Sequence, residues 1–158
     1  MNDRIVINTS PLIALGQMGL FELLRDLPIE MVTPTQVKQE IEAGARLGHP
    51  VGFPEWLDVR DLKFPVDRSL FDRLDSGEAA VIQLALEFNI DTVCIDEIKG
   101  RRIAKELGLS VTGSLGILGR FKRLGIVKEV KPYMQAATDS GIYYEGRVIR
   151  KFLREIGE

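Results

Sequence analysis

The stretch from Arg4 to Leu15 (RIVINTSPLIAL) restricts the fold more than any other part of the sequence. Its short apolar run, Ile5–Ile7, includes β-branched residues and is typical of a strand buried on both faces of a parallel sheet. The following Thr9-Ser10-Pro11 segment has the composition of a helix start. A central strand therefore leads directly into a helix. The small polar side chain of Asn8 is left at the carboxyl end of the strand, where open α/β sheets place their sites.

Strand and helix patterns alternate along the rest of the chain. Further strands are expected over 29–33, 56–59, 92–95 and 109–112, and further helices over 20–27, 34–44, 75–88, 99–107 and 114–124, with two more in the tail 129–158. This alternation predicts an α/β fold with a central, mostly parallel sheet of four to five strands and helices on both faces. We expect residues 1–158 to form a single domain on which the C-terminal helices pack.

The composition excludes several kinds of site. Cys94 is the only cysteine, so neither an internal disulfide nor a cysteine metal cluster can form, and a reducing compartment is favoured. His49 is the only histidine, which excludes a multi-histidine metal site. No apolar run approaches the roughly 20 residues that span a bilayer. The N-terminus also lacks the pattern of a signal peptide. We therefore expect a cytoplasmic protein without a membrane segment.

The two parts of the chain differ in charge. Residues 1–98 hold 8 basic and 17 acidic residues, whereas residues 99–158 hold 13 basic and 6 acidic residues. Such a division could pair metal binding with phosphate binding. Ordinary surface charge that mixes when the chain folds explains it equally well.

Asn8 and Asp96 both follow strands of the buried type. Because parallel strands end at a common edge, both side chains can lie at the carboxyl edge of one sheet. Local explanations compete with this interpretation. Asn8 can hydrogen-bond the backbone of its turn, and Asp96 can cap the helix that follows it.

Glu78 and Glu40 lie on predicted helices, close to their apolar faces. Glu78 shares a face with Ile82 and Ala85, and Glu40 is next to Ile41. Carboxylates on such faces are costly unless a cation or metal is present. Here too local explanations remain, because Asp75 and Glu78 have the spacing of a capping box and Glu40 can be a solvated helix residue. Taken together, three carboxylates and one amide form the oxygen-rich set that Mg²⁺ or Mn²⁺ prefers.

Five stretches of the sequence resemble the PIN domain, a family of small metal-dependent ribonucleases. They are VINTSPLIAL (6–15), VKQEI (37–41), LDSGEAAVIQLALE (74–87), VCIDEIKGRRIAKELGL (93–109) and VTGSLGILGRFKRLGIV (111–127). The chain is most similar to a subgroup whose members resemble the VapC-type toxin halves of toxin–antitoxin pairs. The resemblance implies a three-layer α/β/α fold, Mg²⁺ or Mn²⁺ as cofactor and RNA as substrate. It also implies a homodimer and, for toxin-like members, a small antitoxin that blocks the cleft.

By position, the resemblance implies that the acidic site of the family falls on four residues and one neighbour. These are Asn8, Glu40, Glu78 and Asp96, with Glu97 adjacent. The small hydroxyl residue of the family corresponds to Ser10, less closely to Thr9. Asn8 departs from the family pattern, which has an aspartate there. An amide oxygen can coordinate a metal but brings no charge, so metal affinity should fall. The chain is therefore either a metal-dependent ribonuclease or a weakly active or inactive module that binds RNA or a protein.

Two predicted helices carry basic residues that could contact the phosphates of RNA. Lys99, Arg101 and Arg102 follow Asp96 closely, and a second set lies near the C-terminus at Arg147, Arg150, Lys151 and Arg154. Either set could instead be a solvated face or meet an acidic partner. The apolar residues Leu20, Phe21 and Leu24 could serve a dimer face, although burial in the core explains them more simply. Nucleotide-binding Rossmann enzymes are disfavoured, because neither Gly-x-Gly-x-x-Gly nor a P-loop pattern is present.

Overall fold

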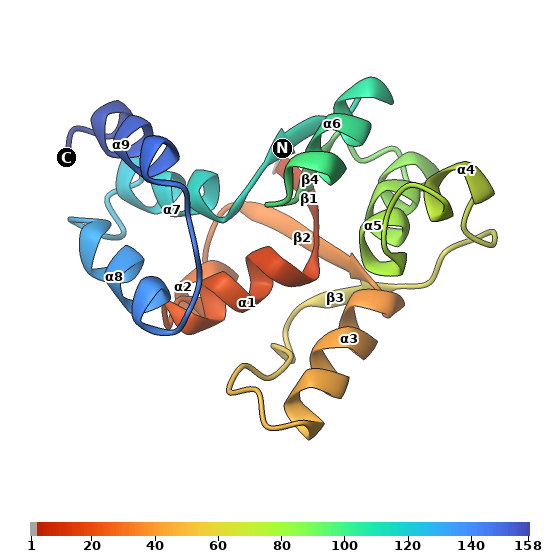
Figure 1. Ribbon diagram of the computed structural model, residues 1–158, viewed down its shortest axis with the longest axis horizontal. Helices are drawn as coiled ribbons and strands as arrows, with labels where there is room; N and C mark the ends of the chain where they lie inside the picture. Colours follow the sequence, from red (N-terminus) through yellow and green to blue (C-terminus); the bar gives the residue numbers. More distant parts are fainter. Residues whose placement is uncertain (1–2) are drawn as a thin grey trace.

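A computed structural model describes residues 3–158 as a parallel sheet covered by helices on both faces (Figure 1). The strands are β1 (Asp3–Ile7), β2 (Ile29–Pro34), β3 (Asp58–Arg60), β4 (Thr92–Cys94) and β5 (Ser110–Thr112). Their order is β3-β2-β1-β4-β5, and every neighbouring pair is parallel. The predicted three-layer α/β/α fold is confirmed, with five strands and an entirely parallel sheet among the described residues.

The helices begin and end close to the predicted positions. They are α1 (Thr9–Gln17), α2 (Phe21–Arg25), α3 (Thr35–Arg46), α4 (Arg68–Phe71), α5 (Ser76–Glu87), α6 (Ile98–Glu106), α7 (Ser114–Arg123), α8 (Lys131–Asp139) and α9 (Gly146–Glu155). The helix expected over 20–27 is shorter than predicted, because α2 ends at Arg25. In Figure 1, α7, α8 and α9 gather at one end of the molecule, α4 and α5 lie at the other, and α3 projects at the bottom.

The central strand β1 owes its place to its apolar side chains. Ile5, Val6 and Ile7 are completely buried, as a strand covered on both faces requires. Leu20 and Leu24 are also buried in the core, and Phe21 packs against it. The simpler interpretation as core is therefore confirmed for Leu20 and Leu24, whereas Phe21 is only partly buried.

The helix α5 is the most deeply buried of the helices. Every residue from Gly77 to Ala85 is buried, and the helix packs against β1, β2, β4 and α3. Its small residues Ala79, Ala80 and Ala85 allow this close approach to the sheet. As a result, the first turn of α5 and its two acidic residues, Asp75 and Glu78, are held in a fixed position.

Helix lengths and hydropathy bear on the expected absence of a membrane segment. Within residues 3–158, the structure contains no helix that is both long and apolar enough to cross a bilayer.

Candidate functional site

The parallel register brings the predicted site residues Asn8 and Asp96, and Gly113 next to them, to one edge of the sheet. Ile7 of β1 pairs with Cys94 of β4, which in turn pairs with Thr112 of β5. Asn8 N donates to Cys94 O at 3.1 Å, and Ile95 N donates to Thr112 O at 2.9 Å. Asn8, Asp96 and Gly113 therefore follow the carboxyl ends of adjacent strands. This edge lies where the strand order reverses between β1 and β4, the usual place for a ligand in an open α/β sheet.

Asn8 occupies the N-cap position of α1, one residue before the predicted cap residues Thr9 and Ser10. Its side chain makes no capping hydrogen bond and is only 5% exposed. Oδ1 is buried and has no hydrogen-bond partner. The expected hydrogen bond between Asn8 and its turn is thus not formed by this oxygen. An unpaired buried acceptor costs about 1–3 kcal/mol, so Oδ1 is an oxygen that gains from a ligand.

Three carboxylates meet where α5 begins and β4 ends. Asp75, Glu78 and Glu97 each contribute one oxygen, and the three oxygens lie within 4.8 Å of one another. Asp75 also caps α5 by accepting from Glu78 N at 2.8 Å. One residue therefore caps the helix while the other points a buried carboxylate into the cluster. Sequence reasoning placed Asp75 beside the site only as a near neighbour of Glu78.

Glu78 is the most perturbed acid of this cluster. The residue is 4% exposed, and its Oε2 is buried without a partner. Burial, a hydrogen bond to the Asp75 carboxylate and the negative charges of Asp75 and Glu97 raise the pKa of Glu78 to about 8. Without a cation, Glu78 therefore carries a proton at neutral pH.

Glu40 approaches the same cluster from α3. Its Oε2 accepts from Thr9 Oγ1 at 2.9 Å, and its Oε1 lies against Gly77 in the first turn of α5. Burial of the carboxylate and the charge of Asp75 raise the pKa of Glu40, against the hydrogen bond from Thr9. Thr9 is therefore the hydroxyl residue that contacts an acidic side chain, whereas the predicted Ser10 is exposed. Glu40 is an exposed residue, so the alternative of a solvated helix residue holds for part of its side chain, while its carboxylate contacts Thr9 and Gly77.

Asp96 is held by the first residue of α7. Its Oδ1 accepts from Ser114 N and its Oδ2 accepts from Ser114 Oγ, each at 2.8 Å. Asp96 thus caps α7, and not the helix that follows it in sequence. Burial raises the pKa of Asp96, although the Ser114 hydrogen bonds and the charge of Arg101 lower it.

Tyr144, in the loop between α8 and α9, completes this arrangement. Its hydroxyl lies 2.7 Å from Ser114 Oγ. Because Ser114 gives its single hydroxyl proton to Asp96, Tyr144 must be the donor to Ser114. Sequence reasoning did not identify Ser114 or Tyr144. The Gly113-Ser114 pair before a helix was a visible signal for the first, but no local pattern marks the second.

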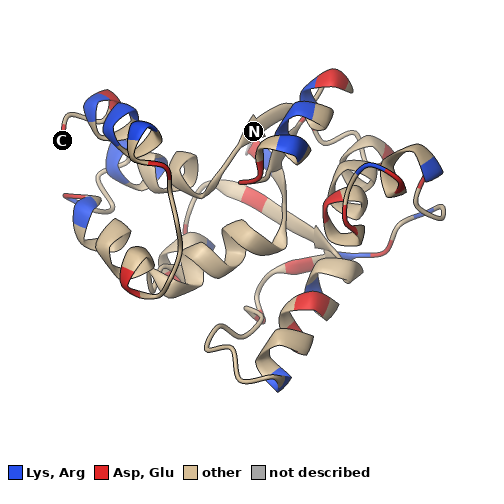
Figure 2. Cartoon of the chain, in the orientation of Figure 1, with Lys and Arg blue, Asp and Glu red and all other residues tan. Residues whose placement is uncertain are grey.

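The predicted basic residues of α6 fall into two groups. Arg101 Nη1 donates to Ile95 O at 2.8 Å, so this guanidinium supports the loop that carries Asp96. Lys99 and Arg102 are exposed. Figure 2 shows basic residues along α6 and along α9, where Arg147, Arg150, Lys151 and Arg154 lie.

The donor set fits a divalent cation. None of Glu40, Asp75, Glu78, Asp96 or Glu97 forms an ion pair with a basic residue of the described chain. Two buried oxygens, Asn8 Oδ1 and Glu78 Oε2, lack partners. Carboxylate and amide oxygens are the ligands that Mg²⁺ and Mn²⁺ prefer. Acidic residues that form no ion pair, with the pKa values of Glu40, Glu78 and Asp96 raised, are able to bind a metal ion.

Comparison with known proteins agrees with this geometry. The family model DUF3368, described as a PIN domain, matches residues 4–158. No curated protein matches the chain.

Proposed function

The chain belongs to the PIN-domain family, whose fold is of the nuclease type, and we propose that it is a metal-dependent ribonuclease that hydrolyses RNA phosphodiesters. The observation that carries this proposal is the acidic cluster of Asp75, Glu78 and Glu97, in which Glu78 has an unpartnered oxygen. Asn8, at the carboxyl end of β1, has a second unpartnered buried oxygen. Asn8, Glu40, Glu78 and Asp96 would hold Mg²⁺ or Mn²⁺. Asp75 and Glu97, which lie beside Glu78, would support them.

A bound Mg²⁺ or Mn²⁺ supplies positive charge for the phosphate oxygens and lowers the pKa of a coordinated water. The side chains of the protein then have supporting tasks. Thr9 orients Glu40 by hydrogen bonding to Oε2, and Ser114 fixes both oxygens of Asp96. Lys99 and Arg102, which are exposed on α6 and follow Glu97 closely in the sequence, would contact phosphates of the RNA strand. Ser10, exposed at the start of α1, is a further substrate contact in this proposal.

We further propose that the chain acts as one domain in the manner of VapC-type toxins. Support for one domain comes from Tyr144, which links the C-terminal segment to Asp96 through Ser114. The similarity to toxin halves supports an antitoxin partner and a homodimer.

A second function, binding of RNA or a protein without cleavage, is favoured by one observation. By the sequence resemblance, Asn8 falls where the family has an aspartate, and an amide brings no negative charge to attract a metal. In this case the carboxyl edge would still bind its ligand.

Cleavage of a labelled single-stranded RNA in Mn²⁺ or Mg²⁺ tests the proposal. We expect metal-dependent cutting by the wild type, strong reduction in Glu78→Gln and Asp96→Asn, and no change in the control Glu42→Gln on the exposed side of α3. Tight RNA or protein binding without any cutting would establish the second function instead. Cutting that survives in Glu78→Gln and Asp96→Asn would refute the assigned site.

A further inference from the structure

A pocket opens at the carboxyl edge of the sheet, between α3 and the segment after β3. Its volume is about 430 Å³. Thr35 and Asp61, at one end of the pocket, directly follow Pro34 of β2 and Arg60 of β3, which are paired in the sheet. The pocket therefore lies outside the carboxyl ends of two strands, where open α/β sheets bind ligands.

The pocket is close to the acidic site. Gln36, which lines it, is one helical turn before Glu40 on the same face of α3. The strand β2 is the direct neighbour of β1, which Asn8 follows, and neighbouring strands are about 4.8 Å apart. A nucleotide next to one engaged at Glu40 would therefore arrive at this pocket.

The wall opposite α3 is held in place by α5. Gln83 Nε2 donates to Phe64 O and to Pro65 O, each at 2.9 Å. Glu87 accepts from Lys63 N at 2.6 Å and from Phe64 N at 3.1 Å. Gln83 is buried, so its two bonds are partly sheltered from water, whereas those of Glu87 are exposed. The segment is thus fixed before any ligand arrives, as in most binding pockets.

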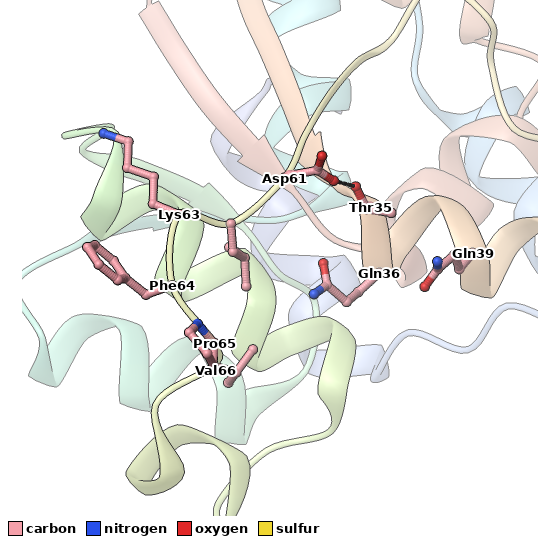
Figure 3. A pocket seen from close by; sticks show the side chains of 9 residues that line it. Thr35, Gln36, Gln39, Asp61, Lys63, Phe64, Pro65 and Val66 are labelled. Carbon is pink, nitrogen blue, oxygen red and sulfur yellow. Dashed lines mark hydrogen bonds between the residues drawn. The ribbon is translucent and has the colours of Figure 1, made fainter.

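The lining combines an apolar wall with hydrogen-bond acceptors. Leu62, Pro65 and Val66 form the apolar side, and Figure 3 shows Gln36 reaching toward Pro65 and Val66 from α3. Gln36 Oε1 is buried and has no partner. At the end of the pocket, Asp61 accepts a hydrogen bond from Thr35 Oγ1 and has a second oxygen free of hydrogen bonds within the described residues.

This chemistry disfavours a phosphate. The one basic residue in the lining, Lys63, extends away from Gln36 in Figure 3, and its ammonium lies 4.6 Å from the centre of the Phe88 ring. A carboxylate and an unpaired amide oxygen instead require a ligand that donates hydrogen bonds. A ligand with a flat apolar face and N–H groups along one edge would match both the apolar wall and the two hydrogen-bond acceptors.

We propose that this pocket binds one nucleobase of the RNA strand, next to the nucleotide engaged at the acidic site. The base lies against Leu62, Pro65 and Val66 and donates its N–H groups to Gln36 Oε1 and Asp61. Guanine fits best, because it carries two adjacent donors, N1–H and the 2-amino group. This inference rests on the proposed ribonuclease function and adds a sequence preference to it.

The first test maps the cleavage sites of wild type, Gln36→Leu and Gln135→Leu in an RNA pool of random sequence. Gln135 is an exposed glutamine of α8 and serves as the matched control. We expect a guanine preference at one position near the cut in the wild type and in the control. In Gln36→Leu this preference should fall about ten-fold. Because the change removes an unpaired buried acceptor, thermal stability should be equal or higher.

A binding measurement separates failure of this inference from failure of the proposed function. Short RNAs with guanine, inosine or adenine at the preferred position are titrated onto the protein in Ca²⁺. If the wild type does not cut RNA, no preferred position is known from cleavage, and all four bases are then placed at each position in turn. Weaker binding of inosine, which lacks the 2-amino group, in the wild type but not in Gln36→Leu supports the pocket even if no RNA is cut. A preference that Gln36→Leu leaves unchanged, a uniform loss for all RNAs, or no base preference in either assay overturns it.

Discussion

The Glu40 carboxylate lies against the Cα of Gly77, so that a Cβ atom at position 77 would overlap Glu40 Oε1. The same relationship recurs twice. A Cβ at Gly100 would overlap Glu78 Oε2, and one at Gly113 would lie 2.6 Å from Asp96 Oδ1. Each of the three carboxylates therefore has a glycine beneath it. In all three cases the missing side chain leaves the space that the carboxylate fills.

Gly77→Ala is expected to separate metal affinity from stability. The added methyl group displaces the Glu40 carboxylate, so affinity for Mn²⁺ should fall about ten-fold, measured by titration calorimetry. Stability should stay equal or rise by up to about 1 kcal/mol, since alanine is the better residue in a helix and the end of the Glu40 side chain can move away. Gly52→Ala, which meets no atom within 4 Å, is the control. Unchanged affinity in Gly77→Ala would show that Glu40 does not bind the ion.

Stability without metal should depend on pH through Glu78. The pKa of this residue is about 8 in the folded protein, against an ordinary 4.5, so the folded state keeps a proton that the unfolded state loses. The free energy of unfolding should therefore fall as pH rises from about 4.5 to about 8, by about 1.4 kcal/mol per unit of pKa difference at most. Urea unfolding in EDTA at several pH values measures this slope, and Glu78→Gln should flatten it.

The same proton links pH to metal binding. A cation needs the ionised carboxylate, so Mn²⁺ affinity should rise with pH up to about 8, and calorimetry in buffers of different ionisation enthalpy should detect proton release. Glu42→Gln should behave as the wild type in both measurements. An equally steep stability slope in Glu78→Gln would assign the pH dependence to another group.

Tyr144 should influence metal affinity only through Ser114. Ser114→Ala removes the hydroxyl bonded to Asp96, for which we expect a loss of about ten-fold in Mn²⁺ affinity, and Tyr144→Phe should cause a smaller loss. In the double variant, Tyr144→Phe should add nothing, because its partner is already absent. Tyr143→Phe is the control, since Tyr143 is 83% exposed. Additive losses of Mn²⁺ affinity in this cycle would mean that Tyr144 acts on the metal site independently of Ser114.

The fold was largely predictable because each strand is short, apolar and followed by a polar turn. The residues of two strand segments are apolar throughout, except for Thr92 at the start of the second; these segments are Ile5–Ile7 and Thr92–Ile95. Because neither segment alternates with polar residues that could face solvent, only a sheet covered on both faces accommodates them. Helix ends were less predictable. The predicted helix over 20–27 extends two residues beyond the end of α2, since apolar periodicity continues through Leu27, which is buried in the turn after Arg25.

The positions of the acidic residues were predictable from strand ends and helix faces, but their contacts were not. Asp96 bonds to Ser114, 18 residues later, and Ser114 bonds to Tyr144, a further 30 residues away. Contacts of this kind depend on how α7 and the loop before α9 pack, and no local pattern encodes them. Arg101 is a similar case. Its place in the sequence, shortly after Asp96, is equally compatible with a solvent-facing phosphate contact and with the inward hydrogen bond to Ile95 O that the structure has.

Asn8→Asp should add a negative charge at the carboxyl edge. Because position 8 is almost fully buried and directly follows β1, next to the end of β4, the new carboxylate should destabilise the metal-free protein by roughly 1–3 kcal/mol. Mn²⁺ should bind more tightly and recover this loss, since an ion that binds only the folded state stabilises it. RNA cleavage should increase accordingly. Asn89→Asp, which adds the same charge elsewhere, is the control, and thermal unfolding with and without Mn²⁺ is the measurement. If both variants respond to Mn²⁺ as the wild type does, Asn8 is not a metal ligand.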